Sequence, residues 1–300
     1  MSDPEQTTEA VPAPQTGAIL ARAVAADFES FFLPDEPMTV RIDVESARNP
    51  GIKGSGDDAR IVITTDMAAQ EIEDADTLFF HLLILGHELA HLVHRHLHAV
   101  EMTQEGDRAL EYWADFYGAK VMMVLTGYGS RCAEIADPLL GELSFEDRIA
   151  AIGRAVARMV EGGFYNEHPR YPKPLLRVSL VFNGVLSFLR LRGHKLSAGL
   201  LVTIFEAFYR TDAVHELVVL HPEHADPDAA PVRQAREWHR AMQGDAIAIT
   251  RGFKLNLMHY LHTTFDQTEE EREASRQERL AEFQAAGFLL ETNPENLRGG

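Results

Sequence analysis

The chain has 300 residues, of which 45% are hydrophobic and 25% charged, and its formal net charge at pH 7 is −18. This length is enough for one large domain or two small ones, and the composition is typical of a soluble globular protein with a sizeable core. Because phosphate binding needs clustered lysines and arginines, the acidic balance argues against nucleic acid or an anionic membrane as the main partner.

The N-terminal segment predicts a tail and not a targeting signal. Residues 1–17 are rich in Pro, Glu and Thr and have few apolar side chains, so we expect them to be disordered. They lack the basic segment and the apolar run of a signal peptide. Cys132 is the single cysteine, which excludes a disulfide within the chain. We therefore expect a cytoplasmic protein.

A helix and two strands are predicted next. Residues 18–33 have the apolar spacing of a helix and stop before Pro34. Residues Met38–Val44 alternate β-branched and polar side chains, and Ala59–Thr65 is again rich in β-branched residues, so both predict strands. The stretch between the two strands contains proline and several glycines and is predicted to be a loop.

Helices are predicted for most of the remaining chain. Two long helices are expected, from Thr77 to about Val100 and from Arg108 to about Leu125, and the pattern from Phe145 onward is almost entirely helical. The most apolar stretches are Val178–Leu189 and Ala198–Tyr209. Both are shorter than the roughly 18 to 20 apolar residues of a membrane span, so we expect buried core helices and no membrane span.

An HExxH motif, His87-Glu88-Leu89-Ala90-His91, lies inside the apolar run of the first long helix. Residues i and i+4 lie on one helix face, about 40° apart, so the two imidazoles can chelate one Zn²⁺. Glu88 can then approach the metal-bound water as a general base. The simpler interpretation is a helix whose two histidines are structural.

A zinc site of this type needs a third protein ligand. The metzincin spacing, with Gly at the seventh and His at the tenth position after the first histidine, fails because His94 and Leu97 stand there. The alternative is Glu111 on the next predicted helix, which 19 residues separate from the second motif histidine. Glu101 and Glu105 are weaker candidates. We therefore predict His87, His91 and Glu111 as the metal ligands.

Asp115 follows Glu111 by four residues and shares its helix face, in an ExxAD pattern. A carboxylate at this place can accept the free ring N–H of a ligand histidine and fix its tautomer. We expect His87 to be that histidine, so Asp115 is predicted to support the site without touching the metal.

A hydrogen-bond donor is also needed for the oxyanion that forms when water attacks a carbonyl carbon. His168 is the first candidate, against the simpler interpretation of a loop histidine before a proline. Tyr165, Tyr171 and Arg177 are alternatives for the same role.

Further histidines crowd the first long helix, at positions 81, 94, 96 and 98. His94 and His98 fall within about 20° of His87 by helical angle, so a second metal site is conceivable. We favour the interpretation that these are histidines on the helix surface.

These motifs together resemble the gluzincin metallopeptidases. The closest resemblance is to the family of HtpX-type heat-shock peptidases, CAAX prenyl proteases and Oma-type mitochondrial peptidases. In that family a strand ending in Thr-Thr precedes the active-site helix, as IVITT does at 61–65, and the third ligand is followed by a segment similar to 114–128. The later His168-Pro169 and Arg177 match family features in kind.

The resemblance covers about residues 40–180, and we find no counterpart in it for residues 181–300. The chain also departs from it in lacking the transmembrane helices that many members have. Soluble Lit-type phage-exclusion peptidases are the second resemblance, and ImmA-type regulator-cleaving peptidases are the third.

The predicted fold class is α+β and predominantly helical, with a small N-terminal sheet packed on the HExxH helix in a zincin-like arrangement, followed by a helical bundle. We expect a disordered tail at 1–17, a zincin-like metallopeptidase domain at 18–220 and a helical C-terminal extension at 221–300.

The predicted function is zinc-dependent cleavage of a peptide bond in a protein or peptide substrate. We expect Ala59–Thr65 to form the sheet edge that holds this substrate as an added strand. Two alternatives remain open: a zinc hydrolase of a non-peptide bond, and a zinc-stabilised regulatory or binding module without turnover.

Overall fold

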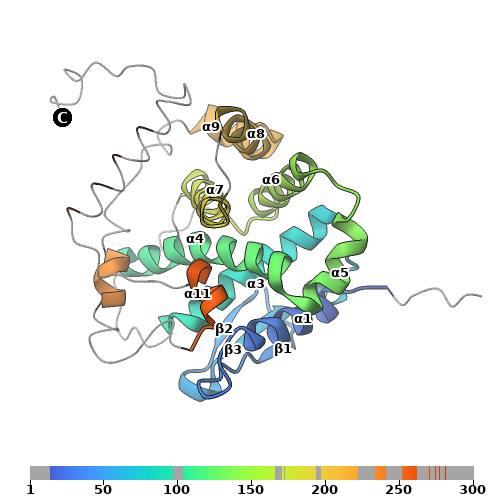
Figure 1. Ribbon diagram of the computed structural model, residues 1–300, viewed down its shortest axis with the longest axis vertical. Helices are drawn as coiled ribbons and strands as arrows, with labels where there is room; N and C mark the ends of the chain where they lie inside the picture. Colours follow the sequence, from blue (N-terminus) through green and yellow to red (C-terminus); the bar gives the residue numbers. More distant parts are fainter. Residues whose placement is uncertain are drawn as a thin grey trace, which may run out of the picture.

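The protein is mostly helical and has one small sheet in the part of the chain that the structure describes (Figure 1). The structure is a computed structural model, and it describes residues 14–96, 104–165, 171, 173–193, 197–221, 234–240 and 252–261, with single positions at 270, 274, 277 and 281. The predicted α+β class, with mostly helices and one small sheet, is therefore confirmed. Most of the predicted tail lies outside the described residues.

The sheet has three strands in the order β1-β3-β2. Strand β3 (Arg60–Thr64) lies in the middle, parallel to β1 (Ile42–Glu45) and antiparallel to β2 (Gly51–Lys53). The prediction that Ala59–Thr65 forms the sheet edge is wrong, because its strand has a partner on each side. The predicted loop between the two strands supplies the second partner, since its three residues at β2 are extended and pair with β3.

Helix α1 (Gly17–Ser30) covers the sheet side of the molecule (Figure 1) and buries Leu20, Val24 and Phe28, which recur every four residues along one face. Its Asp27 is also buried and accepts hydrogen bonds from the backbone N–H groups of Arg131 and Cys132, at 3.0 and 2.7 Å. These N–H groups belong to the first turn of α5 (Ser130–Leu140), where helix N–H groups lack partners within the helix. Asp27 therefore joins α1 to α5 by capping.

Helix α3 (Ala75–Val93) carries the HExxH motif. It begins at Asp74, whose carboxylate accepts the backbone N–H of Thr77 at 2.7 Å, as an N-cap residue does. Short helix α2 (Thr65–Ala69) joins it to the sheet. The helix ends earlier than the predicted Val100, because His94 leaves the helical conformation and Arg95 takes a left-handed one, with φ of 53°.

Helix α4 (Gln104–Tyr128) packs along α3, and glycines allow a very close approach of the two backbones. A Cβ on Gly86 would lie 2.5 Å from the carbonyl oxygen of Gly118, and a Cβ on Gly118 would lie 2.6 Å from the backbone nitrogen of His87. Neither position has room for a side chain. This contact fixes the distance between the helix with the motif and the helix with Glu111.

Further helices build up the side of the α3–α4 pair that faces away from the sheet (Figure 1). Helix α6 (Phe145–Glu161) packs on α3, and α7 (Pro174–Leu191) packs on α4. The last layer on this side contains α8 (Ala198–Tyr209) and α9 (Asp212–Leu220), both of which contact α6.

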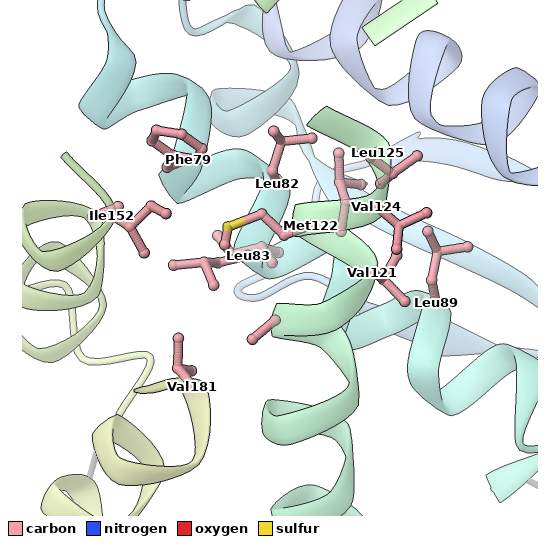
Figure 2. Packing of buried hydrophobic residues seen from close by; sticks show 14 of the residues in the cluster. Phe79, Leu82, Leu83, Leu89, Val121, Met122, Val124, Leu125, Ile152 and Val181 are labelled. Carbon is pink, nitrogen blue, oxygen red and sulfur yellow. The ribbon is translucent and has the colours of Figure 1, made fainter. Parts of the chain in front are cut away.

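The apolar core lies where α3, α4, α6 and α7 meet. Figure 2 shows Leu82 and Leu83 of α3 near Met122 of α4, with Ile152 of α6 and Val181 of α7 on the facing helices. These side chains leave almost no surface to solvent. Among the described helices, α7 alone is long and apolar enough to cross a membrane, but 67% of it is buried inside the protein, so its apolar side chains are used for packing.

The described residues 252–261 of the predicted C-terminal extension contribute to this body. The Tyr117 hydroxyl donates to the carbonyl oxygen of Leu261 at 2.9 Å, which anchors α11 (Leu255–Leu261) on α4. Phe253 packs against Phe28 and Phe32, with ring centroids 6.1 and 4.3 Å away. Part of the core is therefore made by residues that follow position 250.

Candidate metal centre

Helices α3 and α4 bring three candidate ligands to one point. His87 and His91 lie one turn apart on α3, with their Nε2 atoms 3.1 Å from each other. Glu111 comes from α4, and its carboxylate oxygens lie 3.2 Å from His87 Nε2 and 3.5 Å from His91 Nε2. Among the residues that the structure describes, these three form the one group of His, Cys, Asp and Glu side chains that could hold a metal ion.

The three separations fit tetrahedral coordination. A tetrahedral ion with bonds of about 2.0 to 2.1 Å to nitrogen and oxygen has ligand atoms about 3.3 Å apart. The observed separations of 3.1, 3.2 and 3.5 Å surround this value. The side chains could therefore bind one ion together and leave a fourth position open toward the cavity described below.

The position of the ring proton of His87 also favours a bound cation. Its Nδ1 lies 3.0 Å from Asp115 Oδ1, and because an ionised carboxylate only accepts hydrogen bonds, Nδ1 carries the ring proton. The lone pair of Nε2 then faces the Glu111 carboxylate, whose Oε2 atom is buried and lies 3.2 Å away. Two acceptors in contact repel each other unless a proton or a metal ion lies between them.

In the absence of a metal, a proton takes that place. Burial lowers the pKa of His87, but the hydrogen bonds and negative charges of Asp115 and Glu111 outweigh burial and raise this pKa to about 10. The negative charges of Asp115 and Glu111 thus favour a cation at His87. A metal ion bound there replaces this proton.

Asp115 is held by a buried arginine from α7. Arg177 donates from Nε to Asp115 Oδ2 at 2.7 Å and from Nη2 to Oδ1 at 2.9 Å, and its Nη1 donates to the carbonyl oxygen of Phe164 at 3.0 Å. Burial raises the pKa of Asp115, but the positive charge of Arg177 and the hydrogen bond from His87 bring it below its usual value. Asp115 therefore stays ionised and orients His87, the arrangement that its position in the sequence predicts.

Glu88 is the buried acid beside the ligands. Its side chain lines the cavity and is only 8% exposed. Burial raises the pKa of Glu88, and the negative charge of Glu111 adds to this, although nearby His87, His91 and Arg177 act in the opposite direction. A carboxylate with a raised pKa is a better proton acceptor, as a general base requires.

A cavity of about 440 Å³ opens beside these residues. Its polar lining includes the candidate ligands, Glu88 and Arg177. Its lining also includes apolar residues, among them Ile84, Met159 and Phe164, and residues 49–52, which contain the start of strand β2. The cavity is therefore large enough for part of a peptide, and the edge strand β2 contributes to its lining.

The four candidates for the oxyanion donor have different positions. His168 lies outside the described residues, so its predicted role stays a prediction. Tyr171 lines the cavity. Arg177 also lines it, but is engaged with Asp115 and Phe164, and buried Tyr165 lies under its guanidinium group, 4.3 Å from the ring centre. Of the weaker ligand candidates, Glu101 and the side chain of Glu105 lie outside the described residues as well.

The prediction that the additional histidines lie on the helix surface is wrong for those that the structure describes. His81 and His94 are fully buried and His96 is nearly so. The reason is that α3 is covered on almost all sides, and α3 ends before His94 and His96 are reached. His98 lies outside the described residues.

Two features of the site were not predicted from the sequence. The clamp between Arg177 and Asp115 joins residues 62 positions apart, and the one signal for it was a charged residue in the apolar stretch of α7. His239, which contacts His96 across 143 positions, gave no local signal.

Comparisons with protein families, with curated proteins and with solved structures found no match to this chain. The geometry of the site establishes a group, His87, His91 and Glu111, that could hold a metal ion.

Proposed function

We propose that this protein is a zinc-dependent endopeptidase. The observation that carries the proposal is the convergence of two imidazole nitrogens and one carboxylate within 3.1 to 3.5 Å, beside the buried carboxyl group of Glu88. Two histidines, one carboxylate and an open fourth position form the ligand set of catalytic zinc sites in metallopeptidases. Imidazole ligands also favour zinc over magnesium or calcium, which prefer oxygen.

Each side chain of the site has a separate role in the proposed reaction. Zinc in this position would polarise a scissile carbonyl group and lower the pKa of a coordinated water molecule to about 7. Glu88 accepts the proton of the attacking water and delivers it to the leaving amine. Asp115 keeps the proton of His87 on Nδ1, and Arg177 fixes the direction of the Asp115 carboxylate.

The substrate that fits best is an extended peptide. Strand β2 (Gly51–Lys53) is an edge strand, and its residues Gly51 and Ile52 border the cavity. A peptide can pair with such an edge through main-chain hydrogen bonds and present its carbonyl carbon to the ligands. This moves the expected substrate edge from the central strand to β2.

The resemblance to gluzincin peptidases is consistent with this proposal. A small sheet with an antiparallel edge strand beside an HExxH helix, and a glutamate from the next helix, are what a zincin-like fold would have. We accordingly propose zincin-like packing, zinc as the metal and a cytoplasmic location. The two alternatives predict different results: a zinc hydrolase of other bonds would spare all peptides, and a binding module would turn over nothing.

The test combines metal analysis with peptide cleavage. We expect about one zinc ion per chain, bound so that His87→Ala and Glu111→Ala lose it. Glu88→Gln should fold, bind zinc and lose about 10²- to 10⁴-fold in turnover, because the base is removed while the size of the side chain is kept. Glu142→Gln, at an exposed position, serves as the matched control.

Each outcome separates the candidates. Wild-type protein that is loaded with zinc and cuts no member of a broad peptide library would exclude the peptidase. Glu88→Gln protein with wild-type activity would exclude the mechanism. Zinc retained by Glu111→Ala and lost in Glu101→Ala or Glu105→Ala would move the third ligand.

A further inference from the structure

Three imidazoles form a line of contacts that begins at the candidate ligand His91. The Nδ1 atom of His91 lies 2.7 Å from His96 Nδ1, and His96 Nε2 lies 3.0 Å from His239 Nε2. His239 follows His96 by 143 residues and belongs to the helical segment 234–240. Both separations are within hydrogen-bond distance, so each contact needs one donor and one acceptor.

A metal ion at His91 Nε2 determines the direction of every bond in this line. The ring proton of His91 must then be on Nδ1, from which it is donated to His96 Nδ1. His96 consequently carries its own proton on Nε2 and donates it to Nε2 of His239. One coordination bond thus selects the tautomers of three histidines.

The surroundings favour neutral imidazoles that keep these bonds. The side chains of His96 and His239 are almost completely buried, so water does not compete for their nitrogen atoms. Burial lowers the pKa of His239 to about 3, which keeps it neutral and able to accept a hydrogen bond near neutral pH. The rings of His94 and Trp113 lie 5.1 and 5.3 Å from that of His239 and complete its enclosure.

We propose that segment 234–240 is a positioning element of the metal centre, in which His239 acts through His96 on the ligand His91. His96 holds the ring of His91 in the orientation needed for coordination, and His239 holds His96 in the required tautomer. The inference rests on the proposed metal site, because the direction of the bonds follows from coordination at His91.

Metal binding and the docking of this segment are therefore coupled. The hydrogen-bond chain is complete only when segment 234–240 is docked, and its direction is fixed only when the metal is bound. By thermodynamic reciprocity, each then favours the other. A part of the chain far from the motif in sequence thereby contributes to metal affinity.

The test compares two substitutions of His239 in the full-length protein. His239→Phe fills the space of the ring but cannot accept a hydrogen bond, whereas His239→Gln loses the ring but keeps an acceptor oxygen. Partners of metal-bound histidines are worth about 10- to 100-fold in affinity, so we expect His239→Phe to weaken zinc binding about tenfold and His239→Gln to stay within about threefold of wild type. Competition with a chelator measures these affinities.

A role in packing alone predicts the opposite order, since phenylalanine preserves the packed ring and glutamine does not. His94→Gln is the matched control, because His94 touches the same cluster but directs its nitrogens to the Ala90 carbonyl and the Trp113 N–H. We expect this variant to lose stability and to keep its zinc affinity. The visible absorption of Co²⁺-substituted protein, which reports ligand geometry, should change for His239→Phe only.

The ring nitrogens themselves give a second measurement. Nitrogen-15 NMR of the zinc-loaded wild-type protein should show His96 with its proton on Nε2. A proton on Nδ1 of His96 would overturn the proposal, and so would a His239→Phe protein with wild-type affinity and wild-type cobalt spectrum. If wild-type protein binds zinc no better than His87→Ala, the proposed metal site is excluded. That result is distinct from one that excludes only the positioning role of His239.

Discussion

The α3–α4 pair has two ends that use the same two helices in different ways. At the apolar end, Leu82 and Leu83 of α3 pack with Val121, Met122 and Leu125 of α4 (Figure 2). At the metal end, the two helices instead bring together imidazoles and carboxylates, several of them buried. The contact between Gly86 and Gly118 lies between the two ends.

The difference shows how a buried polar site is supported. Apolar burial stabilises by about 25 cal/mol per Å² and requires no particular direction. The metal end loses the hydration of its charged groups, and its ion pairs compensate only where the geometry is good. We infer that the apolar end supplies the stability with which the metal end is held in place.

The largest expected effect is at the metal end. Asp115→Ala removes the partner of both His87 and Arg177. A buried charge left without its partner costs about 3 to 5 kcal/mol, and loss of a partner of a ligand histidine costs about 10- to 100-fold in metal affinity. Denaturant unfolding and chelator competition measure the two losses. An Asp115→Ala protein that keeps both values would show that the clamp is unimportant.

A substitution at the apolar end should change stability alone. Leu82 is completely buried, and Leu82→Ala is expected to lower the free energy of unfolding by about 2 to 5 kcal/mol. The zinc affinity of the folded protein should remain that of wild type, because Leu82 precedes His87 by five residues on α3 and contributes no ligand to the metal group. A loss of zinc affinity comparable to that of Asp115→Ala would mean that the two ends cannot be separated.

His81 is the polar exception at the apolar end, where its Nε2 lies 2.9 Å from Gln70 Oε1. Burial, with a smaller effect of the Arg158 charge, lowers its pKa from 6.5 to about 4. Between these values the unfolded chain binds the proton and the folded protein does not, so stability present above pH 6.5 is lost as the pH falls toward 4. The loss for this one group is about 3 kcal/mol.

Substitution of His81 isolates this contribution from those of the other buried histidines. Between pH 6.5 and about 4, the slope of the unfolding free energy against pH should be smaller for His81→Gln than for wild type, by the amount that corresponds to about one bound proton. Unfolding curves recorded across the window give the slope. An unchanged slope would mean that His81 is protonated in the folded protein.

Gly118→Ala should affect both ends, though less strongly. The new Cβ would lie 2.6 Å from the His87 nitrogen and 2.8 Å from the Gly86 carbonyl carbon, so the helices must move apart. Overpacking of this kind costs about 1 to 3 kcal/mol, and the movement also displaces Glu111 from the histidines. Gly199→Ala in α8 is the control, since its Cβ would meet nothing within 4 Å. Equal behaviour of the two variants would show that the close approach is unimportant.

The sequence predicted those parts of the site that follow from helix periodicity. His87 and His91 share a face because they are four residues apart, and the same rule places Asp115 beside Glu111. Once α3 and α4 are paired, these four side chains meet, as the distances among them show.

The parts that were not predicted depend on contacts between distant segments. Strand β2 is only three residues long and begins with glycine, so its extended form comes from pairing with β3 and not from local preference. The sequence predicted that α3 continues to about Val100, but the helix ends before Arg95, which has a left-handed conformation. This end was not predicted because glycine, the residue that favours this conformation, is absent there. Arg177 was not predicted as the partner of Asp115, because only the folded chain brings α7 next to α4.

The clamp from α7 has a consequence for protein engineering. The segment 87–115 contains every candidate ligand, yet the guanidinium group that orients Asp115 comes from position 177. Transplanting the two motif helices into another scaffold would therefore transfer the ligands without the guanidinium group that orients Asp115. A graft would need a buried arginine at the equivalent place, and an otherwise identical graft without it should bind metal weakly.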